Sequence, residues 1–234
     1  MAGKLRLLSG GAAQGLVQKL SEGLRAETGF EVEGGFGAVG AMKDRLLGGE
    51  PCDVVILTQA LIEQLTSQGH VVAGSATPLG VVKTGVAVKA GERAPDVSSA
   101  MALKSALLGA NVIYFPDPVK ATAGIHFMKV LTALGIAGEL GPRLRAFPNG
   151  ATAMREMSEA PGEGLVGCTQ VTEILYTPGV QLIGLLPKEF ELATVYTAGV
   201  CARSEQPGVA AKFIAMLAGA EAASLRKSGG FDEI

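Results

Sequence analysis

The sequence predicts an α/β protein of two Rossmann-like lobes, each with a mixed sheet, joined by two hinge strands. Short apolar runs alternate with amphipathic segments of helical period along most of the 234 residues, as in repeated strand–helix units. Two long extended stretches, near residues 82–88 and 192–199, interrupt this alternation. We therefore expect a discontinuous lobe 1 (residues 1–82 and 196–234), a lobe 2 (residues 83–195) and a ligand cleft between them.

Three strand–helix units open the chain. Asp53 to Leu57 is a continuous apolar run, typical of a strand buried on both faces of a parallel sheet. Glycines close the helices of these units, as at Gly29 and Gly48. The expected elements are a strand at 5–8, a helix at 15–28, a strand at 30–33, a helix at 42–47, a strand at 53–57 and a helix at 61–68.

A second series of units follows the break at Gly91 to Pro95. The apolar strand Val112 to Phe115 ends at Pro116-Asp-Pro118, and a helix with Phe127 and Val130 on one face follows. The other expected elements are helices at 101–108, 151–157, 171–175, 209–217 and 221–227, and strands at 144–147, 164–167, 180–185 and 191–201.

Composition excludes several partners. The formal net charge of −2 gives no basic field for nucleic acid or anionic lipid. No apolar run reaches the roughly 18 residues of a membrane span. No signal peptide is evident, so we expect a cytoplasmic protein, or a periplasmic one if a leader has been removed. The three cysteines suit neither a disulfide framework nor a zinc ribbon and favour a reducing compartment. We expect no metal and no cofactor, and the oligomeric state stays open.

Three turns are expected to bind an anion. They are Ser9-Gly-Gly-Ala-Ala-Gln14, Gly34-Gly-Phe-Gly-Ala-Val-Gly40 and Lys120-Ala-Thr-Ala-Gly124, and each leads from a strand into a helix. The first N–H groups of a helix have no partner within the helix, and the helix dipole is positive there. The turns therefore indicate a cradle for a small anion.

One glycine turn has a second interpretation. Gly35-Phe-Gly37-Ala-Val-Gly40 matches the G-x-G-x-x-G fingerprint of dinucleotide-binding proteins. A complete strand–helix unit precedes it, however, and Asp53 begins its strand where the fingerprint needs an acidic residue at a strand end. A nucleotide-binding oxidoreductase is therefore only a third hypothesis.

In lobe 2, polar residues near strand and helix ends are candidates for ligand contact. Thr122 either caps its helix or binds the ligand, and Thr169 and Gln170 follow a strand. His126 is either a packed histidine or an acid–base group. Cys168 is read as a packing residue in an apolar strand. The cations placed to neutralise a charged ligand, unless they are merely solvated, are Lys83, Lys120 and Arg155.

With these motifs in place, the chain resembles type II periplasmic binding proteins, in particular their molybdate-binding-protein-like branch of extracellular solute-binding proteins. The resemblance covers nearly the whole chain. It rests on Leu7-Leu-Ser-Gly-Gly-Ala-Ala13, Ala26-Glu-Thr-Gly-Phe-Glu-Val32, the second glycine turn, Glu50-Pro-Cys-Asp-Val-Val-Ile56, Asp117-Pro-Val-Lys-Ala-Thr-Ala-Gly124, Gly162-Glu-Gly-Leu-Val166 and Ala218-Gly-Ala-Glu-Ala-Ala223.

The resemblance implies a protein that closes on a ligand by hinge motion, but the chain departs from the molybdate binders. Their oxyanion accepts hydrogen bonds from hydroxyls in the first two turns, where this chain has Ala12, Ala38 and Val39, and a tyrosine usual near Gln170 is absent. Each lost donor costs about 1–3 kcal/mol, so we expect a different small anion, oxyanion or carboxylate.

The expected ligand-binding residues are Ser9, Gly10, Gly11, Ala12, Gly37, Ala38, Val39, Lys83, Lys120, Thr122, Ala123, Arg155, Thr169 and Gln170. An ABC permease is an expected partner only of an exported form. The alternative is a cytoplasmic isomerase of an unsaturated polycarboxylate, similar to the aconitate isomerases, with His126 as the proton-shuttling group.

Overall fold

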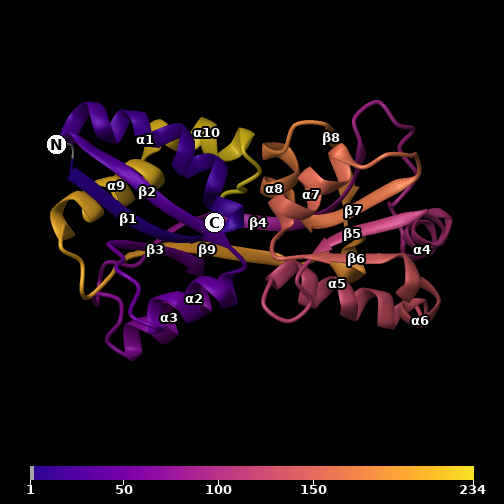
Figure 1. Cartoon of the computed structure of the whole chain (residues 1–234), viewed down its shortest axis with the longest axis horizontal. Coiled ribbons are helices and arrows are strands. Elements are labelled where there is room, and N and C mark those ends of the chain that lie inside the picture. Colours follow the sequence, from indigo (N-terminus) through magenta and orange to yellow (C-terminus); the bar gives the residue numbers. More distant parts are fainter. Residues whose placement is uncertain (1–2) are drawn as a thin grey trace. The chain divides into compact units, whose positions relative to one another are not determined.

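The computed structural model describes residues 3–234 (Figure 1). The chain divides into two compact units. The first unit comprises the described residues up to Val82 together with Thr194–Ile234, and the second comprises Lys83–Ala193. The chain passes from the first unit to the second within the long strand β4 (Thr77–Lys89). It returns to the first unit at the start of the long strand β9 (Ala193–Val200).

The first unit is built on a sheet with the strand order β2-β1-β3-β9. The first three of these strands are parallel, and β9 runs antiparallel to β3. The remaining elements of this unit are β1 (Gly3–Gly10), α1 (Gln14–Thr28), β2 (Phe30–Gly37), α2 (Val39–Leu47), β3 (Val54–Thr58), α3 (Gln59–Ser67), α9 (Pro207–Ala218) and α10 (Ala223–Ser228), with short 3-10 turns at Gly11–Ala13 and Ala220–Ala222.

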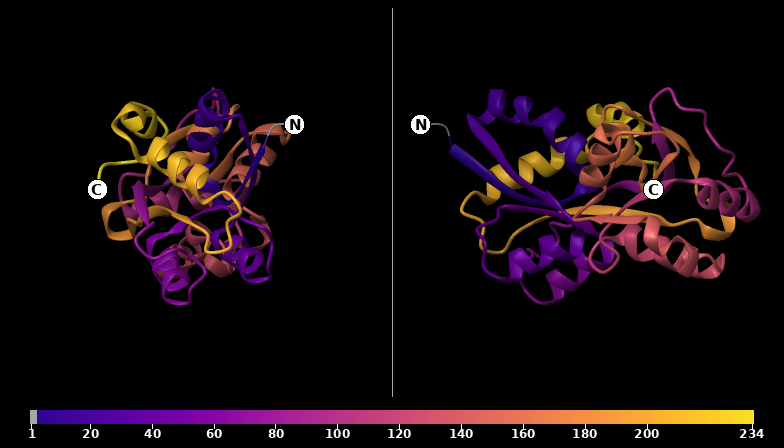
Figure 2. Two further views of the ribbon diagram at one scale, coloured as in Figure 1. Left: turned by 90° about the vertical axis from the view of Figure 1, so that its left-hand side faces the viewer. Right: turned by 45° about the vertical axis from the view of Figure 1, so that its right-hand side comes forward.

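Helices cover both faces of this sheet. Helix α1 packs against α9 on one face, and α2 and α3 lie on the other (Figure 2). Because both faces are covered, the strands read as nearly continuous apolar runs. Leu5, Leu7 and Ile56 are fully buried or nearly so and belong to one core with Leu24 and Phe213.

The second unit has the strand order β8-β4-β7-β5-β6. Strands β7, β5 and β6 are parallel, and β4 runs antiparallel to both β7 and β8. Its elements besides β4 are α4 (Ala100–Gly109), β5 (Val112–Pro116), α5 (Thr122–Ala133), α6 (Ala137–Leu140), β6 (Leu144–Phe147), α7 (Gly150–Glu159), β7 (Leu165–Gln170), α8 (Val171–Tyr176) and β8 (Val180–Leu185), with 3-10 turns at Gly141–Arg143 and Lys188–Phe190.

The two faces of the second sheet bury different cores. On one face, Val86, Val166 and Cys168 pack with residues of α4 and α5 such as Phe127. On the other face, residues of α7 and α8 pack against the sheet and include Met154. Side chains that alternate along β4 and β7 therefore point to different helices.

The glycine run at Gly34 to Gly37 is part of β2, so the turn expected there was wrong. The strand continues because it pairs with β1 as far as Gly10. The glycines make room for neighbouring side chains instead. A Cβ atom at Gly34 would lie 2.7 Å from the Phe36 ring, and one at Gly35 would lie 2.8 Å from the guanidinium of Arg45.

Within residues 3–234, no single helix is long and apolar enough to span a membrane. The pair Pro207–Ala218 and Ala220–Ser228, bent by 48°, meets the length and composition of a span only when taken together. The first of these helices buries Phe213 and Leu217 in the core of the first unit.

Candidate functional site

In the first unit, the ends of two neighbouring parallel strands bring together the first predicted turn and the short connection at Ala38 between β2 and α2. Gly10 at the end of β1 pairs with Gly37 at the end of β2. A 3-10 turn follows β1 at Gly11, and α2 follows β2 at Val39. No side chain caps either helix start. We call Ser9 to Ala12 together with Gly37 to Val39 the first half-site.

Close packing explains why glycine occupies position 10. A Cβ atom there would lie 2.8 Å from Val39 Cγ1 and 3.0 Å from Tyr196 Cε1. The hydroxyl of Ser9 is fully buried and donates to the Gly10 carbonyl at 2.8 Å. The only proton of this hydroxyl is therefore used within the protein, and the first half-site offers backbone N–H groups rather than a side-chain donor.

In the second unit, three buried polar side chains, those of Thr84, Gln170 and Thr172, have no hydrogen-bond partner among the described residues, and the first two lie together. Thr84 on β4 lies directly opposite Gln170 at the end of β7, so their side chains share one face of the sheet. Gln170 is only 3% exposed, and both its amide oxygen and its amide nitrogen lack a partner, as does Thr84 Oγ1. Buried polar groups in proteins are nearly always hydrogen-bonded, so Thr84 and Gln170 are candidates for ligand contact.

Helix α5 begins at the same end of the same sheet face. It packs against β5 and β7, and its Phe127 belongs to the core that contains Cys168, two residues before Gln170. The close approach of its first turn requires Gly124, because a Cβ atom there would lie 2.2 Å from the Pro116 carbonyl oxygen. The start of α5 is thus held against the end of β5, beside the end of β7.

The prediction that Thr122 caps this helix was wrong. Ala121 is the N-cap and Thr122 the first helical residue, and no side chain caps the helix. The first N–H groups of a helix have no intrahelical partner, so those of Thr122 and Ala123 are donors that a ligand can use. We call Thr84, Gln170, Thr122 and Ala123 the second half-site.

Thr169 points to the other face of β7, where it contacts a buried carboxylate. Its hydroxyl donates to Glu173 Oε2 at 2.5 Å. The carboxylate also accepts hydrogen bonds from the backbone N–H groups of Gly150, Ala151 and Gln170. Burial raises the pKa of Glu173, although these hydrogen bonds lower it in part. The start of α7 is therefore occupied by a carboxylate of the chain itself.

The three predicted cations all lie in the second unit. Lys83 lies 3.4 Å from Glu191, whose pKa is lowered by hydrogen bonds from Lys188 and from Lys83 itself. Arg155 is exposed on α7 and lies 3.5 Å from Glu156. Lys120 is also exposed. The contact of these cations with a ligand stays a prediction.

His126 is half-buried in α5, and its Nε2 lies 2.8 Å from the carbonyl oxygen of Phe190. Because the carbonyl can only accept, Nε2 carries the proton and Nδ1 is left to act as a base. Cys168 is fully buried in β7, where burial raises the pKa of its thiol. This environment is that of a packing residue.

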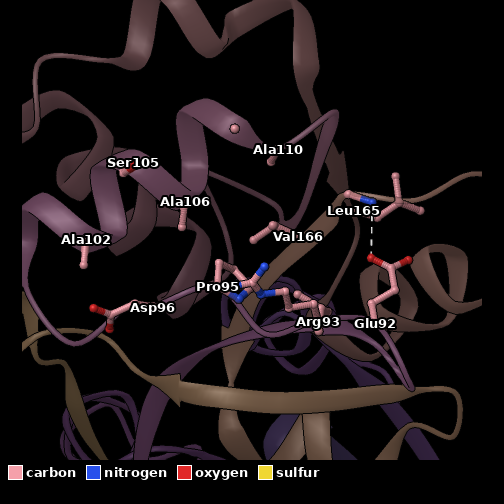
Figure 3. A pocket seen from close by; sticks show the side chains of 13 residues that line it. Glu92, Arg93, Pro95, Asp96, Ala102, Ser105, Ala106, Ala110, Leu165 and Val166 are labelled. Atoms are coloured by element: carbon pink, nitrogen blue, oxygen red, sulfur yellow. Dashed lines mark hydrogen bonds between the residues drawn. The ribbon is translucent and has the colours of Figure 1, made fainter.

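A cavity of about 550 Å³ lies at the opposite end of the second sheet, where β7 begins (Figure 3). Small side chains of α4, among them Ala102 and Ala106, form one wall, and Arg93 and Asp96 carry charge opposite them. The Glu92 carboxylate accepts from the Gly164 N–H at 3.2 Å. None of the predicted site residues lines this cavity.

Sequence reasoning missed Thr84 and Glu173. Thr84 could have been found, because it alternates with Val86 and Val88 along the strand and is the polar member of that row. Glu173 carries no such signal, since its role depends on the start of α7, more than twenty residues earlier in the chain.

Comparison with known proteins gives one family. Residues 5–232 match the model of the family described as bacterial extracellular solute-binding protein. An aconitate isomerase from a Pseudomonas species is 26% identical over 241 residues, which cover 98% of this chain and 88% of that protein.

Solved structures of periplasmic binding proteins of the type II fold are similar to this chain. The periplasmic molybdate-binding protein of Azotobacter vinelandii has a TM-score of 0.80 at 20% identity, covering 97% of this chain and 98% of its own. The sulfate-binding protein of Mycobacterium tuberculosis has a TM-score of 0.75 at 16% identity, covering 99% and 87%. These likenesses confirm the fold class expected from the sequence.

Proposed function

Because the chain belongs to the bacterial extracellular solute-binding protein family, we propose that it binds a small carboxylate in preference to molybdate. The observation that carries the proposal is the buried side chain of Gln170, whose amide oxygen and nitrogen have no partner within the described chain. A buried unsatisfied group costs about 1–3 kcal/mol, so a ligand that completes its hydrogen bonds gains that free energy on binding.

The second half-site supplies the features that a carboxylate needs. The Gln170 amide offers two N–H donors, and Thr84 offers a hydroxyl on the same sheet face. The uncapped start of α5 adds backbone N–H groups and the positive end of a helix dipole. A carboxylate presents two oxygen atoms, which this small set of donors can satisfy.

A tetrahedral dianion would find too few hydrogen-bond donors in the two half-sites. The hydroxyl protons of Ser9 and Thr169 are already donated to Gly10 and Glu173. The first half-site has apolar side chains at Ala12 and Ala38, where hydroxyls would otherwise add donors. Since each missing donor costs about 1–3 kcal/mol, these losses disfavour a ligand with four charged or partly charged oxygens.

A thermal-shift screen tests the proposal. The panel is aconitate, citrate, acetate, sulfate and molybdate, and a ligand at 100 times its Kd stabilises the folded protein by about 2.7 kcal/mol. We expect a carboxylate to raise the melting temperature most. A larger shift with molybdate or sulfate would overturn the preference.

Variants of the two half-sites show which of them a ligand engages. Gln170→Leu removes the amide at similar volume, and Gly10→Ala places a methyl group against Val39. Gln64→Leu, on the exposed face of α3, is the matched control. A ligand whose affinity falls in both variants engages residues of both units, whereas loss in the first alone assigns it to the second half-site.

The second candidate is an isomerase that shifts a double bond in an unsaturated polycarboxylate. Its support is the aconitate isomerase that is 26% identical over 98% of this chain. A base would remove a proton from the carbon next to the double bond, and a proton would return at the far alkene carbon. His126 could do this only through Nδ1, since Nε2 bonds to Phe190.

Isotope exchange separates the two candidates. An isomerase incorporates deuterium from D2O into aconitate, and His126→Gln abolishes this exchange while leaving aconitate binding within about threefold. A protein that only binds shows no exchange above the uncatalysed rate. Exchange that persists in His126→Gln would show that His126 does not transfer the proton.

A further inference from the structure

Two cysteines that are far apart in the sequence meet in the first unit. Cys52 lies just before β3 and Cys201 just after β9, and these strands are antiparallel, with Val54 opposite Val200. The Cys201 N–H donates to the Asp53 carbonyl at 2.9 Å, which continues the ladder by one residue. The two side chains are close enough for Cys52 to raise the pKa of Cys201, and both thiols are free.

The surroundings hold both thiols in place. Asp53, which follows Cys52 in the chain, is buried, and its Oδ1 accepts from the Ser204 hydroxyl at 2.7 Å. Its Oδ2 accepts from the Arg6 N–H at 2.8 Å. The Cys52 thiol also lies 3.1 Å from the Val54 carbonyl oxygen. These bonds fix the start of β3 and the segment after β9 relative to each other.

A small molecule can reach this pair. Cys52 and Cys201 are 6% and 2% exposed, but both line a cavity of about 410 Å³. His70, Arg203, Glu50 and Glu205 line the same cavity, so its wall is polar and carries charges of both signs. Cys168, by contrast, is buried in the core of the second unit.

We propose that Cys52 and Cys201 are a redox-active pair that a low-molecular-weight disulfide, such as glutathione disulfide, oxidises to an intramolecular disulfide. The Cys52 thiolate attacks one sulfur of the small disulfide, which gives a mixed disulfide and releases one small thiol. Cys201 then loses its proton and attacks the Cys52 sulfur, which releases the second small thiol. The two protein thiols lose two electrons and two protons, and the small disulfide gains them.

Cys52 is the more exposed of the two thiols and is the first to meet the small disulfide. Cys52 and burial raise the pKa of Cys201, so the Cys201 thiol keeps its proton until the mixed disulfide has formed. The product ties residues 52 and 201 across the ends of β3 and β9. Closing so long a loop restricts the unfolded chain, so oxidation is expected to raise the melting temperature.

The experiment treats the folded protein with glutathione disulfide and follows intact mass, thiol alkylation and peptide mapping under non-reducing conditions. We expect a loss of two hydrogen atoms, a cross-linked pair of peptides containing Cys52 and Cys201, and a higher melting temperature that dithiothreitol reverses. Mapping of the wild-type protein identifies the bond without relying on any variant.

Single variants provide the controls. Cys52→Ser and Cys201→Ser should each abolish the cross-link, whereas Cys168→Ser should form it at the wild-type rate. The proposal is overturned if both thiols remain alkylatable after treatment, if only a stable glutathione adduct forms, or if the cross-link contains Cys168.

Discussion

Thr84 and Gln170 lie opposite each other on antiparallel strands β4 and β7, and both bury polar side-chain atoms that have no partner within the described chain. An unpaired buried group lowers the stability of the protein without ligand. The pair is therefore expected to lower the free energy of unfolding without ligand and to raise the affinity for a ligand. Both effects can be measured at each position.

Thr84→Val replaces the unpaired hydroxyl with a methyl group of similar size. We expect the free energy of unfolding without ligand to rise by about 1 kcal/mol, because a desolvation penalty is removed. The affinity for the bound carboxylate should fall at least severalfold. Urea unfolding and calorimetric titration measure the two effects.

The matched control for Thr84→Val is Thr177→Val. The Thr177 hydroxyl is also buried, but it donates to the Glu173 carbonyl at 2.8 Å. Its loss should destabilise the protein by about 1 kcal/mol. If both variants destabilise the protein equally, Thr84 is not an unpaired group in the unliganded protein.

The pH dependence of stability should report Glu173. Because burial raises the pKa of Glu173 above its ordinary value of 4.5, the folded state holds this proton more tightly than the unfolded state. The resulting stability is fully present below the unfolded pKa and is lost as the pH rises through the folded pKa.

Glu173→Gln should remove this pH-dependent loss. In urea unfolding from pH 4 to 8, the wild type should lose stability relative to the variant as the pH rises. Glu221→Gln, at an exposed position, should follow the wild type throughout. Parallel curves for the wild type and Glu173→Gln would show that the folded pKa is not raised.

Gly124→Ala should separate the first turn of α5 from the end of β5. The added Cβ atom would lie 2.2 Å from the Pro116 carbonyl oxygen and 2.3 Å from that of Asp117, and neither backbone atom can move cheaply. We expect a loss of about 2–3 kcal/mol in the free energy of unfolding and weaker ligand binding.

Gly208→Ala is the control for Gly124→Ala. Gly208 lies in the first turn of α9, and an added Cβ atom would meet nothing within 4 Å. Its stability should be unchanged or slightly higher, as helix propensity predicts. Equal tolerance of the two substitutions in thermal melts would refute the close packing of α5.

The fold could be predicted because its signal is repeated along the chain. Apolar strands followed by helices that glycines close, as at Gly29 and Gly69, recur in both units, and each repeat supports the same α/β architecture. The error at Gly34 to Gly37 has a physical cause. Glycines signal turns, but in β2 they relieve contacts with Phe36, Arg45 and Met42.

The candidate site was only partly predictable, because its key relationships join distant segments. Gln170 was placed at a strand end from local pattern, but its unpaired state depends on strand pairing with Thr84. The contact between Cys52 and Cys201 likewise follows from the pairing of β3 with β9, which no local pattern specifies. The partners of the predicted cations, such as Glu191 beside Lys83, likewise depend on segments far along the chain.

Calorimetric titration of the wild type and Gln170→Leu with aconitate, citrate and molybdate tests the central claim most directly. The account predicts that a carboxylate binds the wild type more tightly than molybdate does. It also predicts that Gln170→Leu weakens carboxylate binding about tenfold or more, which corresponds to about 1.4 kcal/mol. Tighter binding of molybdate, or unchanged carboxylate affinity in a folded Gln170→Leu protein, would contradict it.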